Sequence, residues 1–229
     1  MKRLGRLTAI IVLGLMALGA AASAEVANPI AANLDSDSAP ERVVAQELCE
    51  ATDGTISFPQ PKCADDQFSR RRIEIDDTCA GAPYRRRLSS IQDDVYRLRV
   101  TEADGEASRP EIFFDMRSGA TGRGGDVRVV RYDDRPGGCP APHRLFRYPS
   151  SATLGAIPKG AVGRDSFSPA LGDRSKRFRG KEIRLTETYV DKDDAFCCPS
   201  FKRVTYFRFS SAADRYVRYA TRVRRLKRK

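Results

Sequence analysis

Hydrophobic and polar residues alternate along much of this chain. Residues 181–190 place Ile183, Leu185 and Tyr189 on one face, and residues 217–223 repeat the same two-residue period. Successive side chains of a strand point to opposite faces, so both segments predict half-buried strands. No segment of ten or more residues shows a helical period. The pattern therefore predicts an all-β protein built from antiparallel hairpins, with little helix after residue 24.

The same alternation predicts further strands along the chain. They fall at residues 42–50, 70–78, 84–89, 95–100, 112–116, 126–132, 145–148 and 204–209. Residues 149–172 are rich in Pro, Gly and Ser, which predicts a long surface connection instead of a strand.

A turn near Gly81 would pair residues 70–78 with residues 84–89. This hairpin places Arg85 opposite Asp76 and Arg87 opposite Glu74, and each such cross-strand pair contributes about 0.2–1 kcal/mol. The two triple-arginine runs, 70–72 and 85–87, are then either a site for a polyanion or a solvated face with acidic partners in its own sheet. We favour the solvated face, because the hairpin supplies those partners.

Two acidic loops share one organisation. Asn33-Leu34-Asp35-Ser36-Asp37 leads through Pro40-Glu41 into a strand, and Glu102-Ala103-Asp104-Gly105-Glu106 leads through Pro110-Glu111 into another. Residues 33 and 102 lie 69 positions apart, a plausible period for a repeated unit. We therefore expect a single all-β domain over residues 25–221, with units that start near residues 33 and 102.

The first loop has the spacing of a calcium-binding loop. Asn33, Asp35, Asp37 and Glu41 stand at relative positions 1, 3, 5 and 9, and hard cations bind several oxygen atoms from one tight loop. In the second loop Glu111 stands one position later. The alternative is a loop without an ion, because Asp, Asn and Ser are also common turn formers. Calcium is the only cofactor that the sequence indicates.

The unit of acidic loop, Pro-Glu pair and strand resembles FG-GAP/VCBS repeats over about a dozen residues in each copy. In that family a calcium loop with its strands forms one blade of an integrin-type β-propeller. The resemblance implies two or three blade-like units, because the chain is too short for a closed ring of seven blades.

The chain begins with the features of a secretory signal peptide. Lys2, Arg3 and Arg6 precede an apolar run over residues 8–21, and Ala22-Ser23-Ala24 fits a cleavage site. A retained membrane anchor is the alternative, but a bilayer span needs about 20 apolar residues. We expect removal of residues 1–24, a secreted or cell-envelope location and no transmembrane span after cleavage.

The net charge of +11 is concentrated at the two ends. The signal contributes +3 and the basic tail, residues 222–229, contributes +6, which leaves +2 for residues 25–221. A nearly neutral body argues against nucleic-acid binding. The tail is either a solvated terminus or a tether to an anionic polymer or lipid of the cell envelope.

A C-terminal segment resembles a second family. Leu171-Gly172-Asp173-Arg174, the hairpin at 181–209 and the acidic turn before Cys197-Cys198-Pro199-Ser200 resemble the LppP/LprE family of actinobacterial envelope lipoproteins. The resemblance covers roughly residues 171–209 and implies an envelope location, with no enzymatic activity to carry over. This chain departs from the family because no cysteine follows its apolar run closely.

Six cysteines in an exported chain predict disulfides. Our preferred pairs are Cys49 with Cys63, Cys79 with Cys139, and Cys197 with Cys198. In the alternative, the two adjacent cysteines each pair with a distant one. Neither a Cys-x-x-Cys spacing nor a neighbouring His supports a redox role, so structural bridges are favoured.

The sequence offers few residues for nucleophilic catalysis. The one histidine, His143, lies between Pro142 and Arg144 and is expected on the surface or in a turn. No Gly-x-Ser-x-Gly elbow is present. The sequence therefore predicts a non-enzymatic binding or structural module of unknown ligand. The alternative is an extracellular hydrolase that acts on cell-wall or exported material.

Overall fold

The computed structural model describes residues 29–35, 37, 39–59, 63–105, 109–118, 124–150, 153–174, 180–192 and 199–226. The predicted signal peptide, Cys197, Cys198 and the last three residues of the basic tail lie outside these ranges. Within them the chain forms thirteen strands and no helix, so the predicted all-β class is confirmed. The described part accordingly contains no helix with the length and apolar character needed to cross a membrane.

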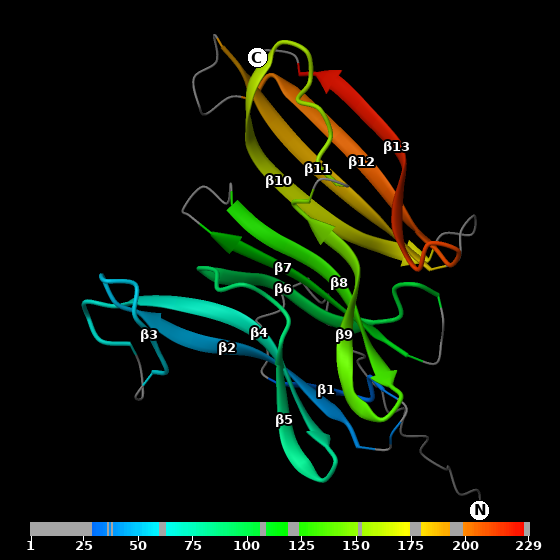
Figure 1. The fold of residues 1–229 in the computed structure, drawn as a ribbon. Helices are drawn as coiled ribbons and strands as arrows, with labels where there is room; N and C mark the ends of the chain where they lie inside the picture. The colour runs from blue at the N-terminus through cyan, green and yellow to red at the C-terminus, as the bar shows by residue number, and fades with distance from the viewer. Residues whose placement is uncertain are drawn as a thin grey trace, which may run out of the picture.

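Consecutive strands form three antiparallel sheets (Figure 1). The first sheet contains β1 (Ile30–Ala32), β2 (Glu41–Glu50), β3 (Ile56–Ser57), β4 (Phe68–Cys79) and β5 (Ala82–Arg87). The second contains β6 (Asp94–Thr101), β7 (Glu111–Ser118), β8 (Gly124–Arg135) and β9 (Gly138–Tyr148). The third contains β10 (Ala161–Arg174), β11 (Lys181–Asp191), β12 (Phe201–Ser210) and β13 (Arg215–Arg225). Each sheet is a four-stranded meander like a propeller blade, and β3 is a short addition beside β2.

The second sheet is stacked between the other two (Figure 1). In β7, Phe114 and Met116 pack in a core with the first sheet, whereas Phe113 packs in a core with the third. Alternate residues point to opposite faces, so a middle strand needs buried side chains at consecutive positions. Strand β7 is accordingly buried from Glu111 to Met116, whereas β12 alternates because only one of its faces is covered.

Two hydrophobic cores hold the stack together. The core between the first and second sheets includes Leu34, Val43, Ile73, Ile75, Phe114 and Tyr132. The core between the second and third sheets includes Phe113, Val129, Phe146, Ile183, Phe207 and Tyr216. Each large side chain that is fully buried contributes about 1.5–3 kcal/mol, so these two interfaces dominate the stability of the stack.

The segment predicted as a long surface connection contains a strand. The prediction of a loop over residues 149–172 is wrong from residue 161 onward, because β10 forms the edge of the third sheet there. An edge strand tolerates Pro169, since it needs ladder hydrogen bonds on one side only. Register shifts against β11 interrupt the two-residue period, which hides the strand in the sequence.

The basic tail begins inside a strand. Strand β13 runs to Arg225, so residues 222–225 belong to the third sheet and the sheet does not end at residue 221. The N–H of Leu226 donates to the Ser200 carbonyl at 2.7 Å and fixes the end of the strand.

Two of the three preferred disulfides are present. Cys49 bonds to Cys63 and Cys79 to Cys139, with Cα–Cα distances of 5.3 Å and 5.5 Å. The first closes a loop within the first sheet, and the second ties the β4–β5 hairpin to β9 of the second sheet. Both bonds fit an oxidising, extracytoplasmic environment.

The predicted register of the first hairpin is confirmed, and Arg85 forms the predicted ion pair with Asp76. Arg85 lies opposite Asp76 and Arg87 opposite Glu74 in the β4–β5 ladder. The chain turns between these strands at Ala80 and Gly81, both with positive φ.

Candidate functional site

The two acidic loops are closed by the same contact. Glu41, the first residue of β2, accepts the N–H of Leu34. Glu111, the first residue of β7, accepts the N–H of Ala103 at 2.5 Å. All four residues are buried, with 0–1% of their surface exposed. The repeat seen in the sequence therefore has a counterpart in the backbone and in one specific side-chain contact.

Three carboxylates gather at the first loop. Asp35 accepts the N–H of Asp37 at 2.9 Å, and Asp37 accepts the N–H of Ala39 at 2.7 Å. Asp77, near the end of β4, faces this turn, and one carboxylate oxygen from each of Asp35, Asp37 and Asp77 lies within 4.8 Å of the others. Clustered carboxylate oxygens of this kind suit a hard cation such as Ca²⁺.

The electrostatics of the first loop favour a cation. Burial raises the pKa of Asp35, and the charges of Asp37 and Asp77 raise it further. Burial and the charge of Asp35 also raise the pKa of Glu41, although its hydrogen bond to Leu34 opposes them. Atom Oε1 of Glu41 is buried without a hydrogen-bond partner among the described residues. A bound cation would offset this crowding of negative charge.

The structure divides the predicted calcium ligands into two pairs. Asp35 and Asp37 come together, and Asp77, which sequence reasoning missed, joins them. Asn33 instead donates from Nδ2 to the Asp37 carbonyl at 2.6 Å, and Glu41 caps the loop. Both of these residues hold the loop in shape through these contacts.

Strand register explains why Asp77 belongs to this site. The β2–β4 ladder ends with Arg42 opposite Asp76, so Asp77 stands one step further, beside Glu41. In the second sheet the β7–β8 ladder ends with Ile112 opposite Val130. Arg131 therefore occupies beside Glu111 the position that Asp77 occupies beside Glu41.

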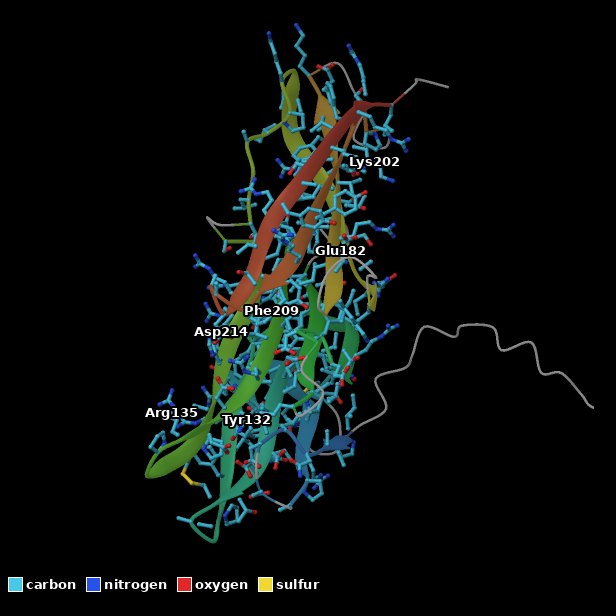
Figure 2. The ribbon with its side chains drawn as sticks, turned by 90° about the vertical axis from the view of Figure 1, so that its right-hand side faces the viewer. Tyr132, Arg135, Glu182, Lys202, Phe209 and Asp214 are labelled. Atoms are coloured by element: carbon cyan, nitrogen blue, oxygen red, sulfur yellow. A yellow bond between two sulfur atoms is a disulfide. The ribbon has the colours of Figure 1, made fainter. Side chains whose placement is uncertain are left out.

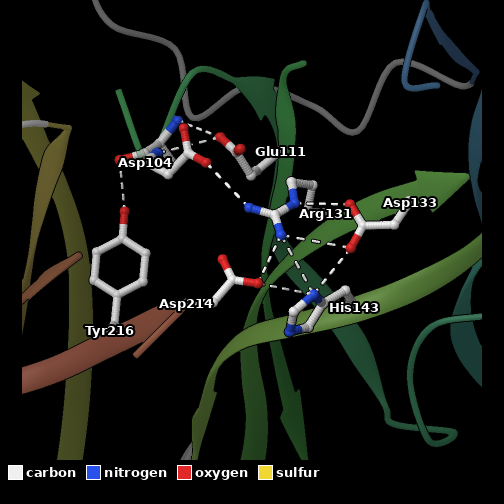
Figure 3. Close-up of polar contacts among 8 residues, drawn as sticks. Asp104, Glu111, Arg131, Asp133, His143, Asp214 and Tyr216 are labelled. Atoms are coloured by element: carbon white, nitrogen blue, oxygen red, sulfur yellow. Dashed lines mark hydrogen bonds and ion pairs between the residues drawn. The ribbon is translucent and has the colours of Figure 1, made fainter. Parts of the chain in front are cut away.

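The second loop contains a positive side chain at that position (Figure 3). Arg131 Nη1 lies 3.5 Å from Asp104 Oδ2, and its other nitrogens lie 2.7 Å from Asp133 and 2.8 Å from Asp214. Asp104 is fully buried. Burial and the nearby charge of Asp104 raise the pKa of Glu111 to about 8.

His143 lies in this network at the surface, as expected, with 39% of its side chain exposed, and it belongs to a strand and not to a turn. It belongs to β9, and its Nδ1 lies 2.9 Å from Asp133 Oδ2 and 3.4 Å from Asp214 Oδ2. Burial works against the charge of Asp133, but the hydrogen bonds from Arg131 and His143 outweigh it and lower the pKa of that carboxyl. The network borders an open pocket of about 570 Å³ lined by Asp104, Arg109, Arg131, Asp133, Asp134, Phe209, Ser211 and Asp214.

Each loop is also held by the next sheet in the stack. Tyr132 of the second sheet donates to Asp77 Oδ2 at 2.9 Å. The Ala103 carbonyl accepts the hydroxyl of Tyr216 and the N–H of Lys181, each at 2.7 Å. A Cβ at Gly180, where φ is +80°, would lie 2.5 Å from the Asp104 carbonyl, so only glycine fits this approach.

Comparison of the chain with models of known families, with curated proteins and with solved structures finds no match. The resemblances to FG-GAP/VCBS repeats and to the LppP/LprE family therefore stay predictions. Function has to be inferred from the geometry of the two loops and of the surfaces around them.

Proposed function

We propose that the protein is a secreted or cell-envelope binding or structural module without enzymatic activity. One observation carries the proposal: the one histidine of the chain and the arginine beside it join two sheets to each other. Arg131 and His143 of the second sheet pair with Asp214 from the β12–β13 turn of the third. A general base has to face a nucleophile or a substrate proton. Across the described ranges, no Ser, Thr or Cys side chain hydrogen-bonds to His143.

Calcium has a structural role in this proposal. An ion held by Asp35, Asp37 and Asp77 would strengthen the contact between the first two sheets, because Tyr132 reaches Asp77 across that contact. The ion would then rigidify a module whose ligand binds elsewhere.

Export to the cell envelope is supported by the two disulfides, which persist in oxidising compartments. An anionic envelope polymer is the proposed partner of the basic C-terminus. Since residues 222–225 lie in β13, a truncation that tests the free tail should begin after Leu226.

An extracellular hydrolase is the second candidate, and one contact favours it. Asp133 lies 2.9 Å from Nδ1 of His143, and a carboxylate at this nitrogen orients the base of a catalytic triad. Ser211 lines the adjacent pocket. A hydrolase would use His143 to activate such a hydroxyl.

The two candidates separate in one experiment. The mature protein and its His143→Ala variant are incubated with purified cell envelope, and both retained protein and released soluble fragments are measured. We expect saturable retention, no fragment release and the same retention for the variant. Release of fragments by the wild type that stops in the variant would establish the hydrolase and contradict the proposal.

A further inference from the structure

An arginine-lined pocket lies where the first and second sheets meet at their edges. Strand β5 ends the first sheet and β9 ends the second. The pocket has a volume of about 480 Å³ and is lined by Arg85, Arg86, Arg87, Arg135, Ala141 and Pro142. Figure 2 shows Arg135 at the tip of the β8–β9 hairpin, projecting away from the sheets.

The two walls of this pocket are fixed to each other. The disulfide between Cys79 and Cys139 joins the β4–β5 hairpin to the start of β9. The hydroxyl of Tyr84 donates to the Pro140 carbonyl at 3.4 Å across the same junction. A ligand therefore meets a site that is already assembled, which lowers the entropy cost of binding.

Most of the positive charge in the pocket is not neutralised by the protein. Arg85 pairs with Asp76 and lies 3.6 Å from Glu74, so its charge is balanced within the first sheet. The other three arginines form no ion pair with an acidic side chain in the described part of the chain: Arg86, Arg87 and Arg135.

Tyr84 fixes the orientation of the Arg86 guanidinium. The guanidinium carbon of Arg86 lies 4.6 Å from the centre of the Tyr84 ring, and Nε of Arg86 donates to the hydroxyl of the same tyrosine. This contact uses one of five N–H donors. The remaining donors form a planar fork that matches two oxygens of a phosphate or sulfate group.

The positive charge continues along β9. Arg144 and Arg147 on this strand are exposed. Partial desolvation of its guanidinium lowers the pKa of Arg144, and the charges of Arg128 and Arg147 lower it further. Strand β9 runs from Gly138, opposite Arg135, to Arg147, opposite Arg128; these positions are nine steps apart, which is about 30 Å at 3.4 Å per step. Such a length suits an extended polymer better than a single small anion.

Protection of sheet edges is the competing explanation. Charged side chains on edge strands prevent pairing with other chains, and both β5 and β9 are edge strands. Edge protection accounts for exposed arginines on either strand alone. It does not require a pocket between two edges that a disulfide holds together.

We propose that this arginine groove, formed by Arg86, Arg87 and Arg135 with Arg144 and Arg147, binds a linear polyanion that carries phosphate or sulfate groups. The inference rests on the proposed role as a binding module and names its ligand class. It adds a polyanion site between the first two sheets to the one proposed on the basic C-terminus.

The test measures binding of the full mature protein to fluorescent inorganic polyphosphate and to a fluorescent sulfated dextran. The groove variant is Arg86→Gln/Arg135→Gln. The matched control is Arg99→Gln/Arg184→Gln, which removes the same charge from exposed positions of β6 and β11, outside both the groove and the basic C-terminus. We expect affinity to fall about tenfold or more in the groove variant, because charge-assisted contacts are lost, and by less than about twofold in the control. The polymer that binds more tightly identifies the phosphate or sulfate source.

Equal losses in both variants would show diffuse attraction to a basic protein and would overturn the groove. No measurable binding of either polymer by the wild type would overturn it as well. Thermal unfolding of each variant, together with Arg86→Lys/Arg135→Lys, separates a folding defect from a lost contact, because lysine keeps the charge without the planar fork. Envelope retention that persists in the groove variant leaves the binding module intact and rejects only this site.

Discussion

The two acidic loops have the same closing contact and opposite electrostatics. In each loop a buried glutamate at the start of a strand accepts the N–H of a buried residue seven or eight positions earlier. Beside that glutamate, the neighbouring strand supplies Asp77 in the first loop and Arg131 in the second. The first loop is therefore a cluster of carboxylates, whereas the second contains its own cation.

This difference shows two ways to stabilise the same bend. Buried carboxylates repel each other and lose hydration, so each loop needs a positive charge nearby. The guanidinium of Arg131 meets that need permanently and reaches Asp104, Asp133 and Asp214. The first loop would instead bind a calcium ion from solution. The contact between the first two sheets would then depend on the calcium concentration.

Removal of the internal cation should have the largest effect. Arg131→Met leaves Asp104 buried without its positive partner, and loss of one member of a buried ion pair costs about 3–5 kcal/mol. Urea unfolding of the wild type and the variant measures the change. Arg131→Lys keeps the charge and should recover part of the loss. If Arg131→Met unfolds within about 1 kcal/mol of the wild type, the guanidinium is not the ion that stabilises the second loop.

Calcium should have the next largest effect, and only through the first loop. An ion that binds the folded state alone stabilises it by about 2.7 kcal/mol at a concentration 100 times its Kd. We expect thermal unfolding of the wild type to shift upward with calcium and back with a chelator. Asp77→Asn should abolish that shift, because it removes one of three clustered carboxylates.

The matched control for this experiment lies in the second loop. Asp104→Asn changes the residue that corresponds to Asp35, beside a built-in cation, and should leave the calcium response intact. A calcium shift that survives Asp77→Asn and disappears in Asp104→Asn would reverse the assignment of the two loops.

Much of the fold can be predicted from the sequence, because alternation of hydrophobic and polar residues indicates a strand with one buried face. It predicted the β4–β5 register with the ion pair between Arg85 and Asp76, and the acidic repeat predicted two related loops. Strand β10 was missed because its register shifts and Pro169 break the period, although Phe167 is buried. The missed signal was a buried aromatic within a segment rich in turn-forming residues.

The candidate sites were less predictable, because their residues come from strands that only the folded register brings together. Asp35 and Asp37 are neighbours in sequence, but Asp77 joins them through the β2–β4 ladder. In the same way Arg86 and Arg135 meet across two sheets that a disulfide connects. Spacing along one loop identifies the residues that this loop contributes, whereas the residue from the partner strand is identified only in the folded structure.

The pH dependence of stability should show the smallest effect for each pH unit, and the part of it that Glu111→Gln removes reports on the second loop. The pKa of Glu111 is about 8 in the folded state, against an ordinary value of 4.5. The folded state therefore holds an extra proton between these two values, and the free energy of unfolding falls as the pH rises from about 4.5 to 8. One proton limits the slope to about 1.4 kcal/mol per pH unit.

Glu111→Gln should flatten this slope, since the amide oxygen still accepts the Ala103 N–H but does not titrate. Glu47→Gln, at a side chain that is 38% exposed, is the matched control and should leave the slope unchanged. Urea unfolding at several pH values measures both variants. A slope that persists in Glu111→Gln would assign the titration to another group and would mean that the guanidinium of Arg131 already keeps Glu111 ionised. The second loop would then hold a compensated ion cluster instead of a shared proton, and its difference from the first loop would be one of cation source alone.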